Sequence, residues 1–332
     1  MTQVTDITPL DKLQDALAAK LADVNSLITS RMESENAPRI PEVTDHLIGA
    51  GGKRLRPMLT LATAAAYGYT GADDAKLAAA VEFIHTATLL HDDVVDESAR
   101  RRGRPTANLL WDNKSSVLVG DYLFARSFQL MVETDSLRVL DILANAAAVI
   151  AEGEVLQLSV AQNLATTEET YLKVIRGKTA ALFAAATEAG AVVAGAPDDQ
   201  VRAFHDYGDA LGIAFQIVDD LLDYGGATAA LGKNVGDDFR ERKITLPLIR
   251  AVAAGNDEER TFWSRVIEKG DQREGDLETA LDILRDRGAL QATKDEALGW
   301  SGRAKAALSS LPEGEMRNHL SDLTDFVVAR IT

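Results

Sequence analysis

The sequence of 332 residues predicts an all-α fold with about ten or more helices. Apolar residues recur at spacings of three and four along most of the chain, which is the period of a helix with one buried face. No stretch shows a convincing alternation of apolar and polar residues, so strands are not expected. Alanine is abundant in the periodic segments, and its small side chain favours helix and lets helices approach closely.

The predicted helices follow one another along the chain. They cover 10–28, 57–67, 74–97, 115–132, 136–164, 168–194, 198–223, 243–254, 258–268, 276–286, 290–309 and 315–331. Segments rich in glycine, proline and polar residues separate them at 49–57, 68–74, 101–106, 195–199 and 225–238. Except for the last, these connections are too short for a flexible interdomain linker, so a single domain is expected over 1–332.

The composition narrows the classes of partner. With 51 acidic and 35 basic side chains the net charge is −16, which argues against nonspecific attraction to nucleic acid or an anionic membrane. The chain has no cysteine, which fits a reducing compartment. Its N-terminal residues lack the pattern of a secretion signal, and no apolar run approaches the roughly 18–20 residues that span a bilayer. We therefore expect a cytoplasmic protein without a membrane span.

Residues 89–108, LLHDDVVDESARRRGRPTAN, place a dense acidic cluster beside a dense basic one. If 74–97 is helical, Asp92 and Asp96 lie one turn apart on the same face, with Asp93 beside them. Three such carboxylates repel one another, and hard oxygen ligands at this spacing suit Mg²⁺, which takes one or two carboxylates and completes its shell with water and substrate phosphate. A solvated acidic helix end is the alternative for one isolated motif.

The same pattern occurs a second time, in FQIVDDLLDY at 215–224, with Asp219, Asp220 and Asp223. An apolar run precedes this triad and would bury one face of its helix. Two acidic helices that face each other could hold several Mg²⁺ ions and a diphosphate between them. The recurrence favours this interpretation over two solvated helix ends.

Basic residues beside glycine or proline predict direct anion binding. GGKRLRP at 51–57 offers Lys53, Arg54 and Arg56 behind a glycine turn, where backbone can approach a phosphate and arginine can bind it with two hydrogen bonds. Further cations are Arg101, Arg102, Lys178, Lys233 and Lys243. Each by itself could be a solvated surface base. Together with the aspartates they predict a site for two anions, one held through metal and one held directly.

The motifs GGKRLRP, FIHTATLLHDDVVDESARRRGRPTAN, LVGDYLFARS, GKTAALF, FQIVDDLLDY and GKNVGDDFRERKITLPLI resemble, in this order, those of the trans-isoprenyl diphosphate synthases. The resemblance spans about 45–250 and is greatest to the long-chain octaprenyl and decaprenyl synthases of quinone side-chain biosynthesis. It implies a homodimer of helical isoprenoid synthase bundles, each around a deep central cavity. An N-terminal helical extension at about 1–40, a catalytic core at about 41–255 and C-terminal helices at about 256–332 are expected.

The implied reaction adds isopentenyl diphosphate head-to-tail to an allylic diphosphate. About three Mg²⁺ ions per active site, which Mn²⁺ could replace, would be held by Asp92, Asp93, Asp96, Asp219, Asp220 and Asp223. Isopentenyl diphosphate would contact Lys53, Arg56, His85 and Arg102, and the allylic diphosphate would contact Arg101, Lys178, Lys233 and Lys243. The dipoles of Lys178, Thr179 and Gln216 would stabilise a carbocation. Without the resemblance, an ordinary core histidine is the favoured interpretation of His85.

The resemblance also implies that the growing chain runs beside the helix that carries the first aspartate triad. Ala87 and Thr88, five and four residues upstream of Asp92, are small and would permit a long product. Phe83, one turn further, either narrows the tunnel or is an ordinary core aromatic. Phe128 and Met131 are candidates for a deeper floor.

One departure from the family pattern and three alternatives remain open. Arg242 stands where the family commonly has glycine before the lysine of its last motif, which affects the expected role of Lys243. A geranylgeranyl or farnesyl diphosphate synthase is the main alternative. A noncatalytic partner subunit of a heteromeric synthase would be expected to lose acidic motifs, and a class I terpene cyclase would lack GGKRLRP and the second aspartate triad. All of these motifs are present here.

Overall fold

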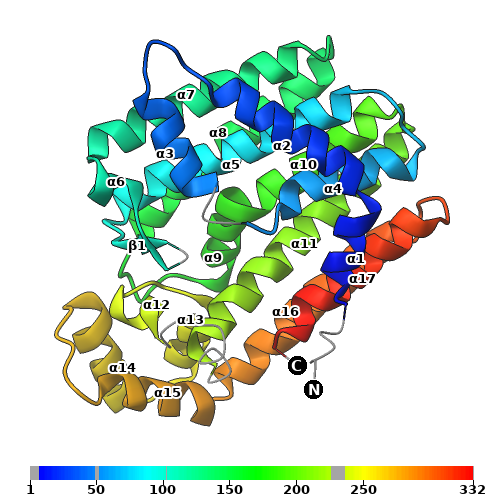
Figure 1. Cartoon of the computed structure of the whole chain (residues 1–332). Helices are drawn as coiled ribbons and strands as arrows, with labels where there is room; N and C mark the ends of the chain where they lie inside the picture. The colour runs from blue at the N-terminus through cyan, green and yellow to red at the C-terminus, as the bar shows by residue number, and fades with distance from the viewer. Residues whose placement is uncertain (1–6, 49–51, 102, 226–235, 332) are drawn as a thin grey trace, which may run out of the picture. The chain divides into compact units, whose positions relative to one another are not determined.

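The structure, a computed structural model of the chain, describes residues 7–48, 52–101, 103–225 and 236–331. These residues are predominantly helical, and more than ten helices follow one another (Figure 1). The predicted all-α class is therefore confirmed. None of the helices in the described ranges combines the length and the apolar character that crossing a membrane requires.

The helices of the first half are α1 (Pro9–Ala16), α2 (Ala18–Met32), α3 (Arg39–Ile48), α4 (Leu55–Ala66), α5 (Asp73–Val95), α6 (Ala107–Leu110), α7 (Asn113–Val132) and α8 (Leu137–Val160). Those of the second half are α9 (Glu168–Ile175), α10 (Ala181–Val193), α11 (Asp198–Tyr224), α12 (Asp237–Arg240), α13 (Leu246–Ala254), α14 (Asp257–Trp263), α15 (Asp276–Asp286), α16 (Ala289–Leu308) and α17 (Glu315–Ala329). Two π-helical turns, η1 (Arg176–Ala180) and η3 (Ser264–Glu268), extend α9 and α14.

Several local features differ from the sequence prediction, among them the short helices α6 and α12, which were not predicted. Helix α3 was not predicted, because its two buried apolar side chains, Val43 and Leu47, form too short a pattern to be recognised. A small antiparallel pair, β1 (Arg100–Arg101) and β2 (Arg104–Pro105), occupies a segment predicted as a loop. The predicted helix 168–194 contains η1, where an extra residue per turn widens the helix.

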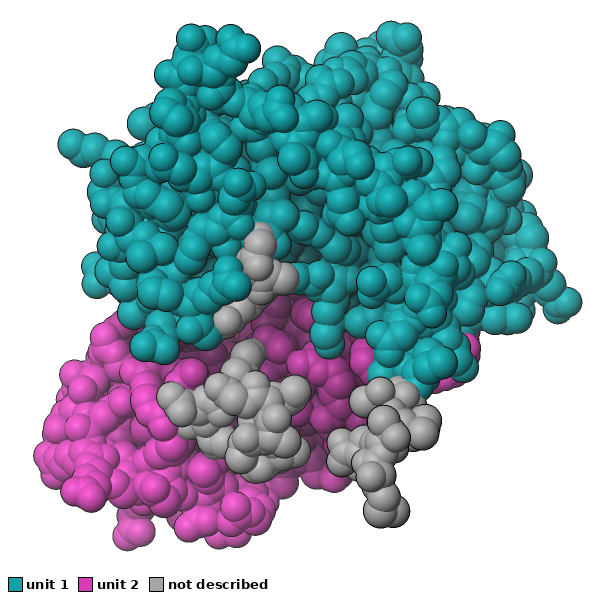
Figure 2. All heavy atoms as spheres, in the orientation of Figure 1, with its two compact units in different colours: residues 1–147, 185–205, 311–320 teal, residues 148–184, 206–310, 321–332 magenta. Residues whose placement is uncertain are grey.

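The chain divides into two compact units (Figure 2). Unit 1 comprises 1–147, 185–205 and 311–320, and unit 2 comprises 148–184, 206–310 and 321–332. Each unit is therefore assembled from three separate stretches of the chain. The expected division into an extension, a core and C-terminal helices stays a prediction.

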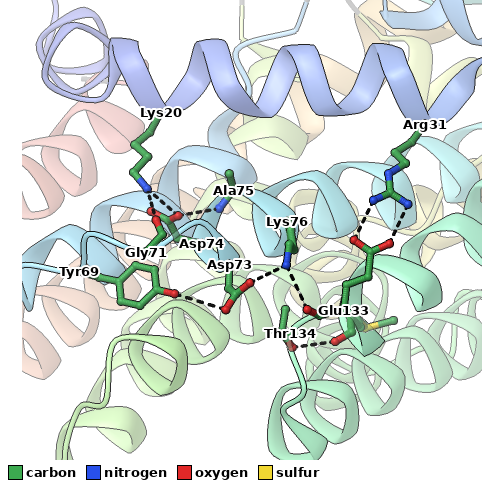
Figure 3. A network of polar contacts seen from close by, with 11 residues as sticks. Lys20, Arg31, Tyr69, Gly71, Asp73, Asp74, Ala75, Lys76, Glu133 and Thr134 are labelled. Atoms are coloured by element: carbon green, nitrogen blue, oxygen red, sulfur yellow. Dashed lines mark hydrogen bonds and ion pairs between the residues drawn. The ribbon is translucent and has the colours of Figure 1, made fainter.

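In unit 1, the long helix α5 is surrounded by α2, α4 and α7. Its alanines, Ala78 to Ala80, are fully buried, which lets neighbouring helices approach closely. Polar contacts hold α2 over this core (Figure 3). Lys20 Nζ donates to Asp74 Oδ1 at 2.8 Å, and Arg31 forms an ion pair with Glu133 at 2.7 Å. Helix α2 is thus anchored to the start of α5 and to the end of α7.

In unit 2, α13, α14, α15 and α16 enclose a second apolar core. Trp263 is its largest fully buried side chain, and Tyr224 and Phe239 join it from α11 and α12. Tyr224 is the last residue of the helix that carries the second aspartate triad. The core therefore anchors the end of this helix.

Candidate active site

The first aspartate triad lies at the C-terminal end of α5. Asp92 and Asp93 belong to the last turn of the helix, and Asp96 is its C-cap, whose N–H donates to the carbonyl oxygen of Asp92 at 2.8 Å. Asp92 and Asp96 are thus one turn apart, as the sequence predicts, whereas Asp93 is fully buried. The triad therefore presents carboxylates both toward the surface and inside the unit.

The buried carboxylate of Asp93 is paired with Arg101. Its Oδ1 atom accepts from Arg101 Nε at 2.9 Å and lies 2.8 Å from Arg101 Nη2. Its Oδ2 atom is also buried and has no hydrogen-bond partner among the described residues. Arg101, predicted to contact the allylic diphosphate, here binds Oδ1 of Asp93. The Oδ2 atom of Asp93 stays available to another ligand.

These residues fit a hard divalent cation. Carboxylate oxygens are the ligands that Mg²⁺ prefers, and a buried Oδ2 without a hydrogen donor is an atom that a cation or its bound water could satisfy. Within the described ranges, no three carboxylate or imidazole groups converge to hold one ion by themselves.

A cationic pocket lies in the same unit. Its ionisable lining residues are His46, Arg54, Glu82, His85, Arg101 and Arg104. Arg56 Nη1 lies 3.2 Å from His85 Nε2, so the structure brings together two residues predicted to bind isopentenyl diphosphate. Lys53 precedes α4 and is exposed, and Arg102 lies outside the described residues.

Glu82 is a site residue that the sequence analysis missed. Its side chain is buried and forms an ion pair with Arg54. The available signal was its spacing, since Glu82 precedes His85 by three residues and therefore lies on the same face of α5. The pair fixes one arginine in the wall of the cationic pocket.

The second aspartate triad lies in unit 2 at the C-terminal end of α11. Asp220 is buried and accepts hydrogen bonds from Tyr171 Oη at 2.6 Å and Gln216 Nε2 at 2.8 Å. Burial raises the pKa of Asp220 to about 7, although both hydrogen bonds oppose this rise. A bound cation would favour its charged form.

The other two aspartates of this triad have different contacts. Asp223 accepts from the backbone N–H groups of Asp237 at 3.2 Å and Asp238 at 3.0 Å, so it caps the start of α12. Asp219 Oδ1 lies 3.5 Å from Arg330 Nη2. Asp238, which the sequence analysis did not single out, has a side chain that is only 16% exposed, and desolvation together with Asp220 raises its pKa. The predicted opposition of the two triads stays a prediction, because they belong to different units.

The turn η1 carries two of the residues predicted to lie beside the reacting carbons. Lys178 Nζ lies 2.9 Å from Glu154 Oε2, and Thr179 Oγ1 donates to Gln216 Oε1 at 2.8 Å. Because Gln216 also donates to Asp220, one chain of hydrogen bonds joins the π-helical turn to the second triad. Glu154 was not predicted, since nothing in the local sequence distinguishes it from a surface carboxylate.

Glycines allow α8 and α11 to pack closely against η1. A Cβ added at Gly153 of α8 would lie 2.7 Å from the backbone nitrogen of Lys178, and one added at Gly177 would lie 2.9 Å from Gly153 Cα. On the α11 side, a Cβ at Gly212 would lie 2.6 Å from Ala180 Cα. A Cβ atom essentially never lies this close to a non-bonded heavy atom. The close backbone contacts therefore require glycine at these positions. The contacts fix the turn that presents Lys178.

The segment around Arg242 keeps the shape that a glycine would give. Arg242 adopts a left-handed conformation, with φ of 57°, which glycine adopts without strain. Lys243 Nζ lies 2.6 Å from Glu241 and 3.8 Å from Asp238. The departure from the family pattern therefore leaves Lys243 beside the partly buried Asp238. Lys233 lies outside the described residues.

The residues predicted to control product length differ in how deeply they are buried. Ala87 and Phe83 are fully buried in α5, and Thr88 Oγ1 donates to the carbonyl oxygen of His85 at 2.8 Å. Met131 is buried, whereas Phe128 is 41% exposed on α7. The role of Phe128 and Met131 as a deeper floor stays a prediction.

Together, the helical fold, the aspartate-rich helix ends and the cationic pocket define the class of isoprenoid synthases. The chain belongs to the polyprenyl synthetase family, whose sequence pattern matches residues 37–284. It is 44% identical to the octaprenyl diphosphate synthase of Escherichia coli (strain K12) over 321 residues, which is 97% of this chain and 99% of the relative. The prediction of a prenyltransferase is thereby confirmed.

Solved structures show the same relationship. The decaprenyl diphosphate synthase from Rhodobacter capsulatus matches with a TM-score of 0.95 and 68% identity, over 97% of this chain and 99% of that chain. A polyprenyl synthase from Caulobacter crescentus CB15, complexed with calcium and isoprenyl diphosphate, matches with a TM-score of 0.92 and 54% identity, over 96% and 97% of the two chains.

Proposed function

We propose that the protein is a Mg²⁺-dependent all-trans polyprenyl diphosphate synthase that makes a product of octaprenyl to decaprenyl length for quinone side chains. The observation that carries the proposal is the pair of aspartate triads, each at the C-terminal end of a long helix and each beside cationic side chains. Two aspartate triads that bind metal ions, together with arginines that bind diphosphate directly, suit a reaction between two diphosphate esters. The long-chain names of the relatives support the product length.

The residues of the chain have distinct tasks in this reaction. Asp92, Asp96 and Asp219 would hold Mg²⁺, which when bound neutralises the allylic diphosphate and assists its departure. Thr179 and Gln216, joined at 2.8 Å, would direct their dipoles at the allylic carbocation. The double bond of isopentenyl diphosphate attacks this cation, and loss of a proton, for which the released diphosphate is the base, completes the new allylic chain.

Activity of the purified protein tests this function. With Mg²⁺, farnesyl diphosphate and labelled isopentenyl diphosphate, we expect a long polyprenyl diphosphate, whose length is measured by chromatography after dephosphorylation. Asp92→Ala and Asp219→Ala should abolish turnover while the circular dichroism spectrum is unchanged. Near wild-type rates in either variant would refute the metal assignment.

The product length has its own test. Ala87 is fully buried in α5, in the turn before Asp92, so a ring at this position would occupy space on the helix that flanks the growing chain. Ala87→Phe should shift the product toward geranylgeranyl or farnesyl length at a similar initial rate. An unchanged product distribution would contradict the proposed path of the chain. If the wild type itself stopped at geranylgeranyl length, the medium-chain alternative would hold.

The exposed surface of α6 and α7 supports the proposed homodimer. Large apolar side chains gather there at Leu109, Leu110, Val117, Leu118, Phe128 and Val132. Several large apolar side chains exposed on two neighbouring helices are typical of protein interfaces. Sedimentation should give twice the mass of the chain, and Leu118→Glu, at a residue 66% exposed, should shift the equilibrium toward monomer. A monomeric wild type would refute the homodimer.

A further inference from the structure

The hairpin of β1 and β2 places two arginines directly opposite each other. Arg101 and Arg104 are cross-strand partners, and both side chains line the cationic pocket in unit 1. Directly opposed residues in an antiparallel pair have Cβ atoms about 4.5–5.5 Å apart, and like charges at this distance destabilise the pair. A short hairpin that keeps two opposed guanidinium groups therefore requires negative charge beside them.

A carboxylate of the chain satisfies one of these two arginines. Arg101 forms two close contacts with the buried Asp93, at 2.9 and 2.8 Å. Arg54, a third arginine of the pocket, is likewise paired with Glu82. Arg104 instead extends from an exposed position of β2 into the lining of the pocket. Its guanidinium is thus placed to meet an anion that enters from solvent.

We propose that Arg104 binds the diphosphate of isopentenyl diphosphate, and that Arg101 acts as a positioning residue for Asp93. This inference rests on the proposed function. The allylic diphosphate leaves during the reaction and therefore needs metal ions, whereas isopentenyl diphosphate keeps its diphosphate and can be held by protein cations alone. Arg104 faces the same pocket as His85, which lies 3.2 Å from Arg56 Nη1.

Arg100 provides a matched control for Arg104. It lies on the same hairpin, opposite Pro105, is exposed, and is not part of the pocket lining. Arg104→Ala and Arg100→Ala therefore remove the same charge from neighbouring positions. The long-range electrostatic effect of the two substitutions should be similar, so a difference between them reports direct contact with the ligand.

The test is calorimetric titration of the wild type and both variants with isopentenyl diphosphate, together with separate KM measurements for both substrates. Arg104→Ala should weaken isopentenyl diphosphate binding and raise its KM about tenfold or more, the effect of losing one charge-assisted hydrogen bond. The kcat and the KM for farnesyl diphosphate should change less than about twofold. Arg100→Ala should resemble the wild type, and Arg104→Lys should fall between the two.

Three results would overturn the inference: unchanged isopentenyl diphosphate binding in Arg104→Ala, an equal loss in Arg100→Ala, or an increase confined to the KM for farnesyl diphosphate. Circular dichroism of each variant verifies folding, and Arg104→Lys replaces Arg104→Ala if the latter does not fold. The titration needs no turnover. A wild type that binds isopentenyl diphosphate but makes no product would refute the proposed function and leave this inference standing.

Discussion

The ammonium group of Lys178 lies 2.9 Å from the carboxylate of Glu154, across the contact between η1 and α8. Both side chains are about one-quarter exposed, so the ion pair is partly accessible to an incoming anion. A diphosphate that binds Lys178 must compete with this carboxylate. Glu154 should therefore weaken the binding of the allylic substrate.

Glu154→Gln should lower the KM for the allylic diphosphate by about two- to tenfold, because it removes a competing partner of modest strength. Lys178→Met should raise the same KM. Steady-state kinetics with farnesyl diphosphate as the varied substrate measures both effects. Glu152→Gln, an exposed carboxylate on the same helix, is the control and should leave the KM unchanged. A higher KM in Glu154→Gln would contradict the competition.

Arg101→Met should destabilise the fold, since it leaves the fully buried carboxylate of Asp93 without its cation. The expected loss is about 3 kcal/mol in the free energy of unfolding, as for other buried pairs from which one member is removed. Urea unfolding measures it. Arg100→Met, on the exposed side of the same hairpin, should cost less than about 0.5 kcal/mol. Equal effects would indicate that the Asp93 pair contributes nothing specific.

Gly153→Ala should disturb the π-helical turn, because its new Cβ would lie 2.7 Å from the backbone nitrogen of Lys178. We expect a loss of about 1–3 kcal/mol from overpacking. We also expect a lower kcat, because Lys178 and Thr179 are displaced together. Thermal unfolding and initial rates provide the two measurements.

The matched control for Gly153 is Gly299 in α16, where an added Cβ meets open space. Gly299→Ala should stabilise the protein by roughly 0.5–1 kcal/mol, because alanine loses less backbone entropy in a helix than glycine does. The two substitutions thus have opposite predicted signs. A stabilising Gly153→Ala with full activity would show that the turn does not need the glycine contact.

The polar network over α5 contains ion pairs of unequal burial (Figure 3). Asp74 is almost fully buried beside Lys20, whereas Arg31 and Glu133 are each about one-third exposed. Lys20→Met should lower the free energy of unfolding by about 3 kcal/mol, and Arg31→Met by at most about 1 kcal/mol. Urea unfolding of the two variants measures both losses in the free energy of unfolding. A larger loss in Arg31→Met than in Lys20→Met would contradict the prediction.

Much of the fold could be predicted because helix formation depends on neighbours in the sequence. The predicted range 74–97 corresponds to α5 at Asp73–Val95, and 276–286 coincides with α15. Short elements without a long apolar pattern, such as α3, were missed for the same reason. The turn η1 was read as ordinary helix because its 5 residues are too few for the apolar pattern to separate a π-helical turn from a regular helix.

The sequence by itself determined the all-α class, the two aspartate triads and the cations that accompany them, because these are local patterns of spacing and charge. Only the tertiary structure decided which partner each charge has. It placed Arg101 on Asp93, Glu154 on Lys178 and Arg104 in the pocket. The energy of an ion pair depends on distance and burial, and packing sets both by joining residues that can lie far apart along the chain.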